Sequence, residues 1–262
     1  MVLELLPNSV NTTPPISNFN PSRDHFARLP LLPLVVYCRL AASLYRVVEL
    51  ASGTIILSLD THSRTTSLAV LRSERILSSY QGEPHEERLL IEIESLLHSV
   101  SLTARDVDMF AFCCGPGIFT SLAVEISAVK ELAAAAQKPA QMVTSLEVSA
   151  FAAGPAPAVF SMISSDEEDL YCQLFSFDDD GAPVAESPPT VARLEQALAQ
   201  VVTLNPLTFA GSGAVANEAS IRMAGPWGKG WSVAQSDLCF AEEVGRLVFL
   251  QFSRGEIDLD FW

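Results

Sequence analysis

The chain has 262 residues, 49% of them hydrophobic, which is enough to bury one large core or two smaller ones. Only 18% of the residues are charged, and 31 acidic residues against 16 basic ones give a formal net charge of -15. Such a chain repels phosphate backbones on average, and no stretch holds the basic cluster that a nucleic-acid-binding face needs. Any contact with a nucleic acid is therefore expected to run through a partner.

The cysteines and histidines indicate neither a disulfide framework nor a metal site. The five cysteines lack CxxC spacing, and the four histidines are scattered without a pair at ligand spacing. The longest apolar run, residues 29–37, is too short for a membrane helix and contains two prolines. We therefore expect a cytoplasmic protein without a membrane segment.

Residues 1–53 differ in composition from the rest and form a poorly defined N-terminal extension. Asn, Pro and Ser crowd the first thirty positions, and a Leu/Val/Ala-rich stretch without sustained period follows. Either this is a flexible appendage, or it precedes the true translation start.

Residues 54–155 predict a first subdomain with the order βββαβαβα. Apolar stripes at spacings of three and four predict its helices, and short apolar runs between turn residues predict its strands. The expected strands are residues 54–60, 67–71, 75–79, 108–114 and 141–143, and the expected helices are residues 86–99, 120–136 and 145–153.

Residues 156–262 predict a second, smaller subdomain in which the order restarts. Strands are expected at residues 158–164, 170–177 and 207–210, and a helix at residues 191–202. The sequence shows no residue-level repeat that would prove a duplication.

Three turns are candidates for binding an anion or a metal. Asp60 and Thr61 end the first strand, where ligands gather in α/β folds. The glycine turns at residues 115–117, followed by Thr120, and at residues 211–213 lie between a strand and a helix, where backbone N–H groups meet anions. Each also has a structural explanation, as a turn acid or a tight turn that needs glycine. The site residues of this prediction are Asp60, Thr61, Gly115, Gly117, Thr120, Gly211 and Gly213.

No catalytic constellation is recognisable. The position that corresponds to Asp60 in the second half is Ser164, so the pair of carboxylates that would hold a magnesium ion is not expected. No serine or cysteine lies in a recognisable nucleophile elbow, and none has a recognisable catalytic partner residue. We therefore predict no catalytic residues, no metal and no cofactor.

In order along the chain, several segments resemble the TsaB family, the smaller actin-like-fold paralogues of the bacterial threonylcarbamoyl-adenosine system. The most specific match is GPGIFTSL at residues 115–122, against the family's GPGSFTGLR. Further matches are ILSLDT at residues 56–61, SLAVL at 67–71, His85 with Leu89 and Leu90, AVKELA at 128–133, SLE at 145–147, DLY at 169–171 and GSGA at 211–214.

Departures from the family pattern remove the basic character of this region. Ile118, Ser121, Ala123 and Glu125 replace small and arginine residues of the family. The catalytic paralogue, TsaD, carries a metal-binding His-Leu-Glu-x-His where this chain has Ser145-Leu146-Glu147-Val148-Ser149. Serine replaces imidazole poorly at such a site, so the comparison implies that the chain is not itself the metal-dependent transferase.

The resemblance implies an α/β fold of two tandem actin/ribonuclease-H-like (ASKHA) subdomains, each a mixed sheet flanked by helices. It also implies a non-catalytic dimerisation subunit that supports a TsaD-like partner in threonylcarbamoyl transfer to tRNA. A TsaE-like ATPase is a possible further partner, and the chain could also form a homodimer. Contact with tRNA is expected to be indirect. The alternatives are an actin-like nucleotide-binding enzyme and a degenerate paralogue that only dimerises. The interface is expected on the first two helices, at Leu90, Ile93, Leu97, Leu122, Ile126 and Val129.

Overall fold

The computed structural model describes residues 53–61, 65–83, 88–117, 119–165, 168–225, 230–235 and 240–257, without the side chains of residues 119–122. Apart from Gly53, the predicted N-terminal extension lies outside the described residues. Within these ranges no helix is long and apolar enough to cross a membrane.

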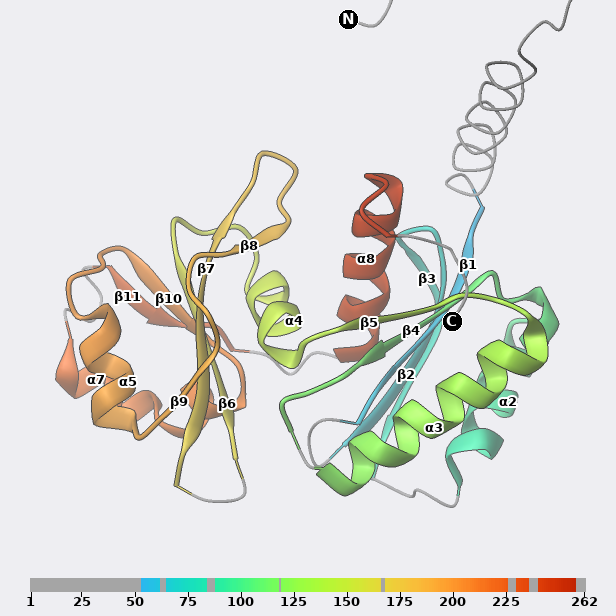
Figure 1. The fold of residues 1–262 in the computed structure, drawn as a ribbon, viewed down its shortest axis with the longest axis horizontal. Helices are drawn as coiled ribbons and strands as arrows, with labels where there is room; N and C mark the ends of the chain where they lie inside the picture. The colour runs from blue at the N-terminus through green and yellow to red at the C-terminus, as the bar shows by residue number, and fades with distance from the viewer. Residues whose placement is uncertain are drawn as a thin grey trace, which may run out of the picture. The chain divides into compact units, whose positions relative to one another are not determined.

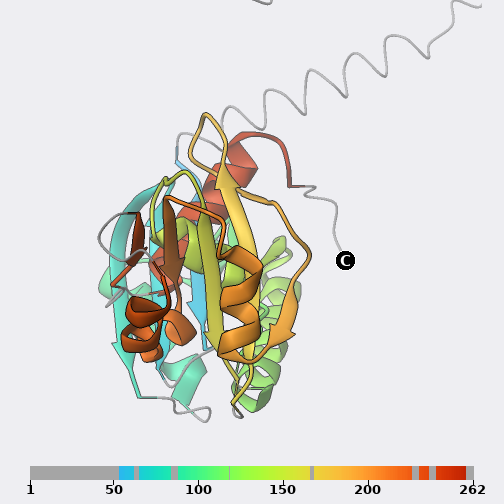
Figure 2. The same ribbon diagram turned by 90° about the vertical axis from the view of Figure 1, so that its left-hand side faces the viewer.

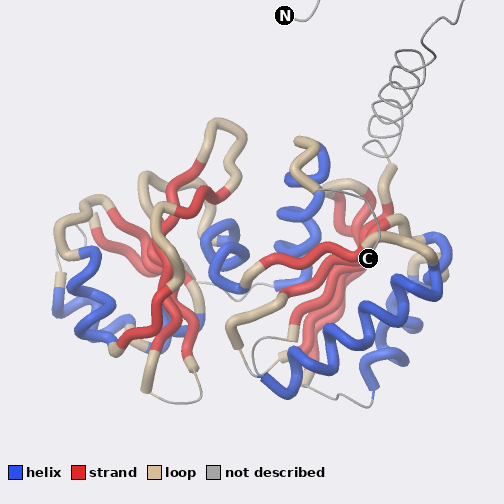
Figure 3. Tube along the Cα trace, in the orientation of Figure 1, coloured by secondary structure: helices blue, strands red, loops and turns tan. Residues whose placement is uncertain are grey.

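The first sheet has five strands in the order β3-β2-β1-β4-β5 (Figures 1 and 3). β2 (Thr66–Arg72) pairs antiparallel with both β1 (Ile55–Asp60) and β3 (Arg75–Gly82). β4 (Met109–Cys113) runs parallel to β1, and β5 (Ala140–Val143) parallel to β4. β1 and β4 are buried along their whole length, because helices cover both faces of the sheet.

Successive side chains of these strands point to opposite faces and so enter two separate cores. Helices α2 (Leu89–Ser99) and α3 (Phe119–Ala136) cover one face, where their apolar residues pack with Leu57 and Phe110. Helix α8 (Phe240–Ser253) covers the other face and packs with Ile56 and Met109 (Figure 1). The short 3-10 helix η2 (Ala104–Asp106) precedes β4.

The second sheet has six strands. β6 (Val159–Ser164) lies between β7 (Leu170–Phe177), which is antiparallel to it, and β10 (Leu207–Ala210), which is parallel. β11 (Trp231–Val233) extends the sheet beyond β10. On its other side, β7 pairs with both β8 (Pro183–Ala185) and β9 (Thr190–Ala192).

Three helices cover one face of the second sheet. They are α5 (Leu194–Val201), α6 (Ser212–Ala216) and α7 (Glu218–Ala224), and Figure 2 shows this group in front of the strands. Their apolar residues pack with Phe160, Phe209 and Trp231. The predicted fold class, two α/β subdomains with mixed sheets flanked by helices, is confirmed.

Helix α4 (Ser145–Ala152) lies between the two sheets and is buried on opposite sides. Its Val148 enters the core under α8, whereas Leu146 and Ala150 pack with Val159 and other residues of the second sheet. The Thr144 side chain caps the helix by accepting a hydrogen bond from the backbone of Glu147.

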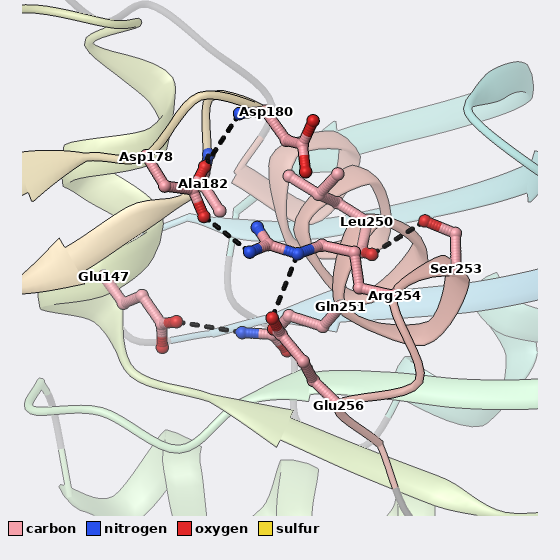
Figure 4. Close-up of polar contacts among 9 residues, drawn as sticks. All are labelled: Glu147, Asp178, Asp180, Ala182, Leu250, Gln251, Ser253, Arg254 and Glu256. Carbon is pink, nitrogen blue, oxygen red and sulfur yellow. Dashed lines mark hydrogen bonds and ion pairs between the residues drawn. The ribbon is translucent and has the colours of Figure 1, made fainter. Parts of the chain in front are cut away.

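Polar contacts also join α8 to the second sheet (Figure 4). Arg254 pairs with Asp178, in the turn between β7 and β8, at 2.6 Å. Asp178 is already fixed there, because it accepts hydrogen bonds from the backbone N–H groups of Asp180 and Ala182. Next to this pair, the Gln251 amide donates to the Glu147 carboxylate of α4 at 2.9 Å.

The structure departs from the sequence prediction mainly in the second half of the chain, where β8, β11, α6 and α7 were also not predicted. The helix expected at residues 191–202 begins only at Leu194, because residues 190–192 form β9 and pair with β7. The last helix, α8, was not predicted at all, and it packs on the first sheet. The predicted second subdomain, residues 156–262, therefore contributes its final helix to the core of the first.

Candidate functional site

Asp60 and Thr61 lie at the end of β1, next to the end of its parallel neighbour β4. Parallel strands bring their carboxyl ends to one edge of a sheet, where α/β proteins commonly bind ligands. Both side chains are buried, with 1% of Asp60 and 5% of Thr61 exposed.

Glu125 of α3 fills the space between these strand ends. It is fully buried, and one of its oxygens, Oε2, accepts hydrogen bonds from the backbone N–H of Thr61 at 2.8 Å and from its hydroxyl at 2.5 Å. The other oxygen, Oε1, accepts from the backbone N–H of Cys113 at 3.2 Å. One side chain of α3 therefore connects the ends of both strands.

The carboxyl groups of Asp60 and Glu125 are both buried and lie close enough for the Asp60 charge to act on Glu125; we refer to them as the carboxyl pair. Burial and then the Asp60 charge raise the pKa of Glu125 to about 8, although the hydrogen bonds from Thr61 and Cys113 act in the opposite direction. Burial, together with the same two carboxyl groups, also raises the pKa of the Cys113 thiol well above its usual value, so this thiol is unreactive.

The sequence did not predict the carboxyl pair. The sequence comparison sought a partner at the equivalent strand end, Ser164, whereas the structure provides it from a helix. Among the described residues, no three His, Cys, Asp or Glu side chains gather closely enough to hold a metal ion.

The glycine turn at residues 115–117 is attached to helix α4. Gly115 has a φ of 88°, and its peptide bond to Pro116 is cis. The carbonyl of Gly115 accepts from the backbone of Ser145 at 2.9 Å, and the carbonyl of Pro116 accepts from the Ser145 hydroxyl at 2.5 Å. Gly117 is half-buried, and the side chain of Thr120 lies outside the described residues.

The second glycine turn lies tightly against β6. A Cβ atom on Gly211 would be 2.6 Å from the Met162 carbonyl, and one on Gly213 would be 3.0 Å from the same atom. The backbone N–H of Ser164 donates to the hydroxyl of Ser212 at 3.1 Å. Close packing explains both glycines.

The two serines that the resemblance aligned with metal-binding histidines are unsuited to a metal. The Ser145 hydroxyl is engaged by Pro116, and Ser149 is 2% exposed beside the Gly211 turn. Hydroxyl groups are also weaker ligands than imidazole. The residues present therefore do not fit the metal of the catalytic paralogue.

The predicted interface residues separate into surface and core. Leu90 is 52% exposed, and its neighbour Ile91 is 56% exposed, whereas Ile126 is only partly buried. Ile93, Leu97 and Val129 are at most 3% exposed and pack in the core with the first sheet, so they offer no surface to a partner. The side chain of Leu122 lies outside the described residues.

Comparisons with known proteins agree with this architecture. TsaB of Bacillus subtilis is 29% identical over 95 residues, which is 35% of this chain and 42% of that protein. The tRNA N6-adenosine threonylcarbamoyltransferase of Thermodesulfovibrio yellowstonii is 30% identical over 140 residues, 47% of this chain and 40% of that enzyme. The chain thus spans less than half the length of these curated relatives.

Solved structures match a larger part of the chain. YeaZ from Pseudomonas aeruginosa superimposes with a TM-score of 0.63 at 25% sequence identity. A second protein from Pseudomonas aeruginosa, described as similar to peptidase YeaZ, superimposes with a TM-score of 0.65 at 27% sequence identity. Each comparison covers 78% of this chain and 94% of the other. Residues 69–200, half of the chain, match the family described as "TsaD: tRNA N6-adenosine threonylcarbamoyltransferase". The chain therefore belongs to the TsaD family, which includes the YeaZ-like proteins.

Proposed function

We propose that this chain is a non-catalytic scaffold subunit that binds a TsaD-like transferase and supports threonylcarbamoyl transfer to tRNA. The observation that carries the proposal is the use of Ser145 for structure, at a position where the resemblance places a metal ligand in the catalytic paralogue. The similarity to TsaB of Bacillus subtilis supports the same role. The net charge of -15 supports a tRNA contact that runs through the partner.

The surface proposed for the partner is the exposed apolar pair Leu90 and Ile91 on α2. A single exposed leucine or isoleucine side chain costs a protein little free energy. Two adjacent ones form a small apolar patch, and a partner that covers both gains free energy from burying them. Val129, which the sequence also favoured, is fully buried, so changing it would disturb the core rather than the contact.

The test is co-purification of the full chain with the TsaD-like protein of the same organism. Changing Leu90 and Ile91 together to Asp is expected to reduce binding at least about a hundredfold, because two charges would be buried without partners. Met223→Asp is the matched control, since Met223 is 90% exposed on α7 of the other sheet.

Three outcomes separate the alternatives. Loss of the complex in the α2 variant alone, at an unchanged melting temperature, supports the scaffold role. A complex that survives the α2 change contradicts the proposed surface. Threonylcarbamoyl transfer by the purified chain without a partner contradicts the non-catalytic role. In a separate measurement, light scattering of the chain alone and of its α2 variant shows whether the same surface joins two copies.

A further inference from the structure

Two serine hydroxyls are buried where helix α4 packs on the second sheet. Ser149 of α4 is 2% exposed, and Ser161 of β6 is fully buried. Among the described residues, no group forms a hydrogen bond with either side-chain oxygen. Burying a hydroxyl without a hydrogen bond is unfavourable, so nearly all such groups in proteins are paired with another protein group or with ordered water. The partner of these two hydroxyls is therefore not a group of the described chain.

Both hydroxyls belong to the same packed layer. Successive residues of a strand point to opposite faces of the sheet, so Ser161 shares a face with Val159 and Ile163. These two residues pack in one cluster with Ala150 of α4, the residue that follows Ser149. The two serines thus lie on facing elements, one on the helix and one on the strand that it covers.

Gly211 marks the place where the two serines approach each other. It follows Ala210, which lies directly beside Ser161 in the parallel pairing of β10 with β6. A Cβ atom on Gly211 would be 3.1 Å from the Ser149 hydroxyl oxygen and 2.6 Å from the carbonyl oxygen of Met162. Three polar atoms from α4 and β6 therefore surround a residue that has no side chain of its own.

We propose that one water molecule is bound beside Gly211, where it accepts hydrogen bonds from the Ser149 and Ser161 hydroxyls and donates one to the Met162 carbonyl. A buried water in a protein makes about three hydrogen bonds to polar groups that would otherwise be unsatisfied. A carbonyl oxygen has two lone pairs, so Met162 can accept from the water even when it also accepts from the backbone.

The water gives α4 a directional link to β6. The rest of this layer consists of apolar contacts between α4, β6 and β10, and apolar burial has no preferred direction. A hydrogen-bonded bridge, in contrast, fixes where the helix lies along the strand. Because α4 also packs under α8 through Val148, this link lies at the contact between the two subdomains.

The test is the stability of the full chain with each serine changed to alanine, singly and together. Ser149→Ala and Ser161→Ala each remove one hydrogen bond of the water and weaken its hold on the other serine. The unfolding equilibrium constant is therefore expected to rise about five- to tenfold in each variant. The double variant should be no less stable than the weaker single variant, because its second change removes a hydroxyl that has already lost its bridge.

Urea denaturation measures these constants, and Ser95→Ala is the matched control. Ser95 is exposed in the middle of helix α2, so its change reports the gain in helix propensity that alanine brings by itself. Hydroxyls without a bridging water predict the opposite result, since alanine then removes an unsatisfied group and each single variant is at least as stable as the unchanged chain. That result, or losses that simply add in the double variant, overturns the inference.

A crystal structure of the unchanged chain gives the direct readout. One ordered water within hydrogen-bonding distance of both the Ser149 and Ser161 hydroxyls is expected, and it should be missing from the double variant. An unchanged chain without that water overturns the inference. Neither measurement involves the TsaD-like partner, so the proposed function and this site are tested separately.

Discussion

Gly211 and Gly154 share a backbone conformation but differ in their surroundings. Both have positive φ angles, 92° and 77°. A Cβ atom on Gly211 would lie 2.6 Å from the Met162 carbonyl and 3.1 Å from the Ser149 hydroxyl, whereas one on Gly154 would meet nothing within 4 Å. Gly211 alone therefore combines an unfavourable backbone angle for side chains with a lack of space.

Gly211→Ala is expected to lower the free energy of unfolding by about 3 kcal/mol, because a steric clash adds to the backbone strain. Gly154→Ala should cost only about 1 kcal/mol, the strain alone. Urea denaturation of both variants measures the difference. Equal losses would show that the turn relaxes away from Met162.

Sequence patterns located Asp60 and Thr61 at a strand end but not the residue that completes the site. Glu125 interacts with Thr61, which lies 64 residues earlier in the chain. The apolar stripe of α3 does not show whether an acid on that helix is buried or exposed. The only signal was the replacement of a small family residue by glutamate. Likewise, Ile93 and Val129 have the spacing of either a core or a contact residue, and only the fold assigns them to the core.

At the scale of elements, the first half of the chain was the more predictable. Its strands and helices were expected within one to three residues of their observed bounds, because each carries a strong apolar period. β8 and β9 were missed, since strands of three residues are too short to show alternation. Val191 and Ala192 belong to β9, yet their spacing also continues the stripe of α5.

Helix α4 gives an element-scale prediction through Val148, which is fully buried in the core under α8. Val148→Ala is expected to lower the free energy of unfolding by about 2 kcal/mol, since it leaves a cavity where α4, α8 and β4 meet. Val202→Ala is the control, because Val202 is 60% exposed and should change stability by less than about 0.5 kcal/mol. A similar loss in both variants would argue against tight packing of α4 on the first sheet.

At the scale of the whole molecule, the pair of Arg254 and Asp178 attaches α8 to the β7–β8 turn (Figure 4). A hydrogen bond from Arg254 lowers the pKa of Asp178 below its ordinary value. The pair therefore stabilises the fold above the ordinary pKa of aspartate, and this contribution is lost as the pH falls through the lowered value.

Arg254→Gln is accordingly expected to lower the melting temperature at pH 7 and to have a smaller effect at pH 3. Arg193→Gln is the matched control, since its pair with Glu168 lies within the second subdomain with both side chains largely exposed. Calorimetry at both pH values compares the two variants. An Arg254→Gln effect that is the same at pH 3 and pH 7 would show that its side chain acts through packing rather than charge.

Helix α8 also bears on how the chain folds while it is being synthesised. The last strand of the first sheet ends at Val143, but the helix that covers one face of that sheet starts only at Phe240. A growing chain thus leaves the ribosome with Ile56, Leu71 and Met109 still uncovered until α8 emerges. At a synthesis rate of about 5–20 residues per second this interval lasts several seconds or more, long enough for a chaperone to bind the nascent sheet.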